Sequence, residues 1–69
     1  MTQEEFNRIP STAIGKKVVY REYIPSIDRY KVTTGIVEGF GQICNDGSLV
    51  VRSYGMRHVV HFAYIIRID

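Results

Sequence analysis

Several residue types are scarce in this chain of 69 residues, and each scarcity excludes a class of protein. The single cysteine cannot form a disulfide within the chain, which excludes a disulfide scaffold. No apolar run approaches the roughly 20 residues that a membrane-spanning helix needs. Cys44, His58 and His61 are too few for a structural zinc site, which usually takes four Cys or His ligands, so we expect no bound metal.

An excess of charge of one sign is also missing, since nine Lys and Arg face seven Asp and Glu. Residues 1–14 carry a net charge of −1 and residues 15–69 a net charge of +3. This mildly basic balance permits nucleic-acid binding without requiring it, because dedicated binders concentrate their cations in a patch. The acidic N-terminus lacks the basic start and apolar stretch of a signal peptide. Together with the single cysteine, this favours a cytoplasmic location and no membrane partner.

What the chain does have is many Val, Ile and Tyr residues, which are typical of strands. The length allows one domain. We expect a short helix and connector over residues 1–14, followed by a β domain over residues 15–69. Thr2 and Glu5 have the spacing of a capping box at a helix start, and Pro10 ends the helix.

Five strands are predicted over residues 16–24, 30–42, 48–54, 57–62 and 65–68. Turn residues separate them, at 25–29, at Asn45-Asp46-Gly47, at Gly55-Met56 and at 63–64. The second strand contains three glycines, a composition that often marks a bulge or a sharp bend at a barrel corner. The predicted fold is therefore mainly β, a five-stranded antiparallel barrel with a short N-terminal helix.

The last hairpin has a register that can be counted from its turn. With Gly55-Met56 as a two-residue turn, Tyr54 lies opposite Arg57, and its ring is expected to receive the guanidinium as a cation–π pair. One face is then the core side, and the other is a mixed basic and aromatic face. The core side holds Leu49, Val51, Val60 and Phe62, and the mixed face holds Val50, Arg52, Tyr54, Arg57, Val59 and His61. An ordinary solvent-exposed strand face is the competing interpretation.

No arrangement in the sequence indicates catalysis. There is no recognisable Ser-His-Asp signature, and the glycines of the second strand have no helix after them, as a phosphate-binding loop requires. Cys44 has the character of a small buried hydrophobe. We therefore expect a protein that is not an enzyme and has no cofactor.

Binding to a macromolecule is the class of function that remains. Bases stack on aromatic rings while cations follow the phosphates, so nucleic-acid binding is the first hypothesis. The candidate residues for nucleic-acid or partner binding are Lys16, Lys17, Arg21, Arg52, Tyr54, Arg57 and His61. The alternative is a protein-interaction module or small inhibitor, of phage or mobile-element type, that uses the same face or the loop at 25–29. A homo-oligomer would extend so small a core.

Residues 16–68 resemble an SH3-like barrel. The resemblance depends on residues 16–20, on the bent strand at 34–40, on Asp46-Gly47 and on the closing segment at 62–68. The short helix and five strands are similar to Sm-like RNA-binding proteins, although Val60-His61-Phe62-Ala63 stands where the Hfq type has Tyr-Lys-His. Val59-Val60-His61-Phe62 is similar in position to Val-Gln-Ile-Tyr of plasmid-type dihydrofolate reductase, a tetrameric enzyme whose Gln and Ile are missing here.

Overall fold

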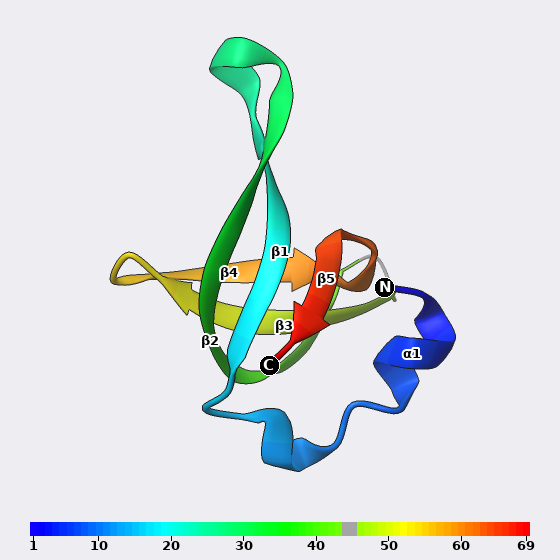
Figure 1. Ribbon diagram of the computed structural model, residues 1–69. Coiled ribbons are helices and arrows are strands. Elements are labelled where there is room, and N and C mark those ends of the chain that lie inside the picture. The colour runs from blue at the N-terminus through cyan, green and yellow to red at the C-terminus, as the bar shows by residue number, and fades with distance from the viewer. Residues whose placement is uncertain (44–45) are drawn as a thin grey trace.

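The fold is a single antiparallel sheet with one short helix, as the sequence predicts (Figure 1). The computed structural model describes residues 1–43 and 46–69. The helix is α1 (Gln3–Asn7), and the strands are β1 (Lys17–Ile24), β2 (Arg29–Ile43), β3 (Asp46–Ser53), β4 (Met56–His61) and β5 (Ile65–Ile68). Three short 3₁₀ turns connect them, η1 (Ser11–Ala13), η2 (Pro25–Ile27) and η3 (Phe62–Tyr64).

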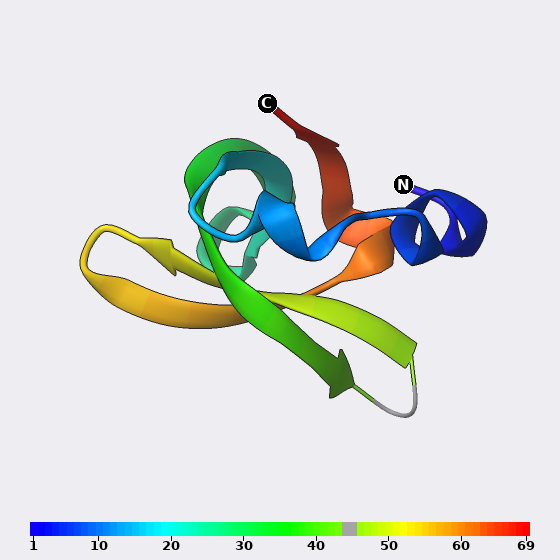
Figure 2. The same cartoon turned by 90° about the horizontal axis from the view of Figure 1, so that it is seen from below.

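The strands follow the order β4-β3-β2-β1-β5, so β4 and β5 form the two edges of the sheet. The sheet bends strongly, as a barrel does, but these two edges do not pair with each other and the sheet is not closed. The far end of the β1–β2 hairpin, with η2 at its tip, projects away from the rest of the sheet (Figure 1). In the view of Figure 2, β2 crosses between this hairpin and the β3–β4 hairpin.

The long strand β2 joins two hairpins that point in different directions. Its first half pairs with β1 and its second half pairs with β3, with Ile36 shared between the two ladders. Gly35 lies at a close approach of β2 to β3: a Cβ there would stand 2.5 Å from Val51 Cγ1 and 2.7 Å from the Arg52 carbonyl oxygen. A register shift between Val37 and Gly39 leaves Glu38 as the extra residue of a β-bulge. The expected bend in this strand is therefore present.

The core lies on the inner face of the bent sheet. Its buried cluster consists of Val18, Tyr20, Val37, Leu49, Val51, Val60 and Ile65. Helix α1 begins with the capping box of Thr2 and Glu5 that the sequence predicts. Phe6 on this helix packs against the core and covers Gly47, where it meets Phe40 and Phe62 at ring-centroid distances of 6.3 and 6.1 Å. Phe62 belongs to η3 and is half-buried, not part of the fourth strand.

The predicted turn between β3 and β4 is wrong by one position. The turn residues are Tyr54 and Gly55, both with positive φ (52° and 76°), which is the pattern of a type I′ turn. Arg57 therefore pairs with Arg52 and not with Tyr54. Moving the turn by one residue shifts the register by two, so each residue that lies in β3 or β4 keeps the face predicted for it, whereas Tyr54 lies in the turn and Phe62 in η3. Of the other predicted turn, Asp46 and Gly47 are strand residues, while Asn45, like the preceding Cys44, lies outside the described residues.

The close approach at Gly35 generates a prediction. Gly35→Ala forces a methyl group against Val51 and the Arg52 carbonyl, and we expect the free energy of unfolding to fall by about 1–3 kcal/mol, as for overpacked cores. Thermal unfolding followed by circular dichroism measures this as a melting temperature lower by about 4–8 °C per kcal/mol. Gly39→Ala is the matched control on the same strand, because its Cβ meets no atom within 4 Å. Equal melting temperatures for the two variants would contradict the close approach.

Candidate functional site

Three exposed tyrosines and one arginine gather on the outer side of the β1–β2 hairpin. Tyr23 and Tyr30 are cross-strand partners with ring centroids 5.3 Å apart, and Tyr64 of η3 stacks on Tyr30 at 5.9 Å with an interplanar angle of 27°. The exposed fractions of Tyr23, Tyr30 and Tyr64 are 46%, 51% and 38%. We call Arg21, Tyr23, Tyr30 and Tyr64 the tyrosine surface. It brings together rings that are far apart in the sequence and leaves them accessible.

Arg21 fixes the arrangement of this surface. Its Nη2 donates a hydrogen bond to the Ala63 carbonyl oxygen at 3.1 Å, which holds the arginine against η3. The guanidinium carbon lies 5.4 Å from the Tyr30 ring centroid and 5.8 Å from that of Tyr64, within the range of cation–π interactions. The rings and the cation are thus held together by β1, β2 and η3.

The hydroxyls at this surface also have neighbours. The Tyr23 hydroxyl donates a hydrogen bond to Asp28, and this bond raises the pKa of the Tyr23 phenol. The Tyr64 hydroxyl acts on Tyr30 in the same direction and raises its pKa. Both phenols therefore remain neutral at physiological pH and present uncharged aromatic faces.

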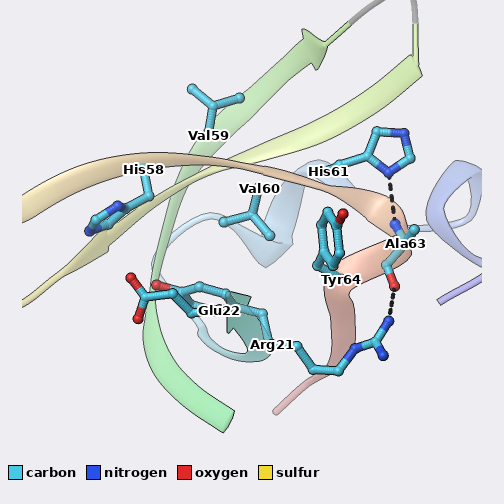
Figure 3. A pocket seen from close by; sticks show the side chains of 9 residues that line it. Arg21, Glu22, His58, Val59, Val60, His61, Ala63 and Tyr64 are labelled. Carbon is cyan, nitrogen blue, oxygen red and sulfur yellow. Dashed lines mark hydrogen bonds between the residues drawn. The ribbon is translucent and has the colours of Figure 1, made fainter. Parts of the chain in front are cut away.

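A groove of about 520 Å³ opens beside the tyrosine surface, between β1 and β4 (Figure 3). Its apolar floor includes Tyr20 and Val60 of the core, and Tyr64 lines it from η3. The complete lining consists of Tyr20, Arg21, Glu22, His58, Val59, Val60, His61, Ala63 and Tyr64. We call it the β1–β4 groove. Because Arg21 and Tyr64 belong to both features, the groove and the tyrosine surface are continuous.

The ionisable side chains of the groove differ in whether hydrogen bonds hold them. His61 is fixed: its Nδ1 accepts a hydrogen bond from the Ala63 N–H at 3.1 Å, and its Nε2 lies 3.1 Å from Asp46 Oδ2. Figure 3 shows His58 and Glu22 toward the other end of the groove. Among the described residues, neither an ion pair nor a side-chain hydrogen bond is made by the Glu22 carboxylate. The groove therefore has an unengaged acceptor at one end and an aromatic wall at the other.

A second charged cluster lies on the outer face of the β2–β3–β4 part of the sheet. The Glu38 carboxylate, placed by the bulge, accepts from Arg52 Nε and Arg57 Nε, each at 2.9 Å. The pKa of the Glu38 carboxyl is lowered, chiefly by the hydrogen bond from Arg52. Burial opposes this effect, and the hydrogen bond from Arg57 and the charges of both arginines add to it. One carboxylate thus offsets half of the positive charge predicted for this face.

The predicted site residues fall into more than one place, and three of them, Lys17, Arg52 and Tyr54, line a second, smaller pocket away from the β1–β4 groove. The cation–π pair of Arg57 with Tyr54 is wrong, because Tyr54 stands at the turn, 86% exposed, and Lys31 Nζ lies 5.9 Å from its ring centroid instead. Lys17 pairs with Asp69 at 3.4 Å. Lys16 is exposed beside it. Of the predicted residues, only Arg21 and His61 line the groove, so the structure does not bring the full predicted set together.

Sequence reasoning missed several residues that this arrangement makes prominent. The sequence predicts a turn at Tyr64, and nothing in its local sequence indicates that η3 stacks it on Tyr30. Glu38 was missed because a bulge cannot be located to a single residue from a strand with three glycines. The signal that the sequence offers is the presence of Tyr23 and Tyr30 on either side of the predicted turn at 25–29; the structure pairs them because β2 begins one residue earlier, at Arg29.

The lowered pKa of Glu38 predicts a dependence of stability on pH. Because the folded-state pKa lies below the unfolded one, the stabilisation is present above about pH 4.3 and is lost as the pH falls through the folded-state pKa. We expect Glu38→Gln to unfold at lower urea concentration than wild type at pH 7, with the difference shrinking toward pH 3. Glu4→Gln, on the exposed first turn of α1, removes the same charge and is the control. A difference that stays constant with pH would contradict the assignment.

Comparison of the chain with models of protein families, with curated proteins and with solved structures found no match. In the described part of the chain, no helix is long and apolar enough to cross a membrane. Residues 1–43 and 46–69 also contain no group of three or more Cys, His, Asp or Glu side chains that could hold a metal ion. The function has to be inferred from the chemistry of the tyrosine surface and its groove.

Proposed function

We propose that this protein is a non-enzymatic module that binds single-stranded nucleic acid through the tyrosine surface. The observation that carries the proposal is the set of three exposed rings in contact, two of which, Tyr30 and Tyr64, hold the Arg21 guanidinium over them. Each base has a flat π face, so unpaired bases stack on such rings whatever their sequence. A duplex keeps its bases stacked on one another and would leave these rings unused.

The fixed positions of the rings favour this kind of ligand. Stacking requires rings that are already oriented, since ordering a side chain on binding costs free energy. Tyr30 meets Tyr23 edge-on and stacks on Tyr64 while remaining half-exposed, and Arg21 is anchored by its bond to Ala63. A guanidinium held over aromatic rings, as Arg21 is, can pair with a phosphate while a base stacks on a neighbouring ring. The arrangement supports a short contact of a few nucleotides.

The fold is also consistent with binding to nucleic acid. A bent five-stranded antiparallel sheet with a short N-terminal helix is compatible with the SH3-like barrel, and with the Sm-like RNA-binding proteins that the sequence resembles. Folds do not determine function, so this agreement adds less than the tyrosine surface does.

A second candidate function is protein interaction. It is favoured by the tip of the β1–β2 hairpin, where Ile27 of η2 is exposed, and by the exposed Val32 beside Arg21. Apolar side chains at the end of a projecting hairpin suit a protein partner better than a nucleic acid. If the protein does not bind nucleic acid even at low salt, this candidate is favoured, because phosphate contacts are strongest at low salt.

Fluorescence anisotropy of labelled single-stranded 12-mers tests the first candidate. We expect Tyr30→Leu to weaken binding by about 1–3 kcal/mol, since this is the contribution of one base stacked on an aromatic ring. We expect Arg21→Ala to reduce the slope of log affinity against log salt by about 0.7, the value for one lost phosphate contact on a single strand.

Tyr54→Leu and Arg57→Ala are the matched controls for these two variants. Tyr54 lies outside the stacked rings, and Arg57 is already engaged by Glu38. Both should bind close to the wild-type affinity. Larger losses for the controls than for Tyr30→Leu and Arg21→Ala would move the interface to the β3–β4 hairpin and would contradict the tyrosine surface as the binding site.

A further inference from the structure

The β1–β4 groove adds a second element to the proposed binding surface. It shares Tyr64 with the tyrosine surface, so a strand whose base stacks on Tyr30 runs directly toward the groove. At about 520 Å³ the groove can accept a single unstacked base, and its floor of Tyr20 and Val60 is apolar, as a base plane prefers. Single-stranded recognition commonly splays out one base in this way and reads its edge by hydrogen bonds.

The hydrogen-bonding chemistry of the groove is uneven. Arg21 is engaged by the Ala63 carbonyl oxygen, and His61 is engaged by the Ala63 N–H and by Asp46. Glu22 is half-buried at the groove, and no side-chain donor among the described residues bonds to its carboxylate. Lys31, its cross-strand partner, has its ammonium group by the Tyr54 ring instead. The groove thus keeps one strong acceptor available to a ligand.

A carboxylate accepts hydrogen bonds and donates none, which restricts the base that it can read. Guanine presents two adjacent donors on its Watson–Crick edge, N1–H and N2–H₂, and these match the two carboxylate oxygens. Adenine and cytosine each place an acceptor nitrogen beside their single amino group, and uracil flanks its N3–H with two carbonyl oxygens. Only guanine therefore forms a bidentate, charge-assisted pair with a carboxylate without repulsion.

We infer that the β1–β4 groove is a guanine-selective subsite in which Glu22 reads the Watson–Crick edge of an unpaired guanine. The inference rests on the proposed function, because the tyrosine surface delivers the strand to the groove. His58 lines the groove at the same end as Glu22. The subsite adds base preference to a surface that otherwise binds any single strand.

Labelled RNA hexamers of uridine with one central guanosine, adenosine, cytidine or uridine test the inference by anisotropy. We expect the guanosine hexamer to bind the wild-type protein about 5- to 150-fold more tightly than the others, the discrimination of one bidentate contact. Glu22→Gln replaces one acceptor oxygen with an amino donor, so most of this preference should disappear while binding of the uridine hexamer stays near its wild-type value. Circular dichroism checks that the variant folds.

Glu38→Gln is the matched control, because it removes the same charge on the opposite face of the sheet and should keep the guanosine preference. Equal affinities for the four hexamers, or a preference that survives in Glu22→Gln, would overturn the subsite. In either case a weakening by Tyr30→Leu would leave the proposed function standing. The absence of binding to any hexamer at low salt would overturn both.

Discussion

The structure depends on the absence of a side chain at position 35. Gly35 lets β2 pass close enough to Val51 and the Arg52 carbonyl for one strand to pair with both β1 and β3. The bulge at Glu38 then turns the second half of the strand. Because of this bend, the β1–β2 and β3–β4 hairpins point in different directions, and the inner faces of both enclose one core.

The candidate site follows from that bend. A bent sheet whose edges do not pair leaves room between β1 and β4, and this room is the groove. The chain crosses the end of this opening through η3, which delivers Tyr64 to the groove and to the rings of Tyr23 and Tyr30 at once. Arg21 connects the two parts by bonding to η3 while lying against the rings.

The helix and the strands can be predicted from the sequence, but much of how they pack together cannot. The capping box of Thr2 and Glu5 and the alternation in β3 and β4 depend on local spacing, so the sequence reveals them. The sequence predicts the turn at Tyr54-Gly55 one residue too late, since a tyrosine with positive φ is rare and Gly55 suits the first position of another turn type.

The site was harder to foresee than the fold. Face assignments survived the error in the turn because the register moved by two residues. The predicted cation–π pair, however, required Tyr54 and Arg57 to be cross-strand partners, and this prediction is wrong. The stacking of Tyr64 on Tyr30 and the two bonds of Glu38 are long-range contacts set by η3 and the bulge, which no local pattern specifies.

The central claim, that bases stack on the tyrosine surface, is tested most directly by aromatic ¹H–¹³C NMR spectra recorded during titration with a single-stranded hexanucleotide. Ring-current shifts at Tyr23, Tyr30 and Tyr64, with Tyr54 unchanged, are the predicted result; shifts confined to Tyr54 would contradict it.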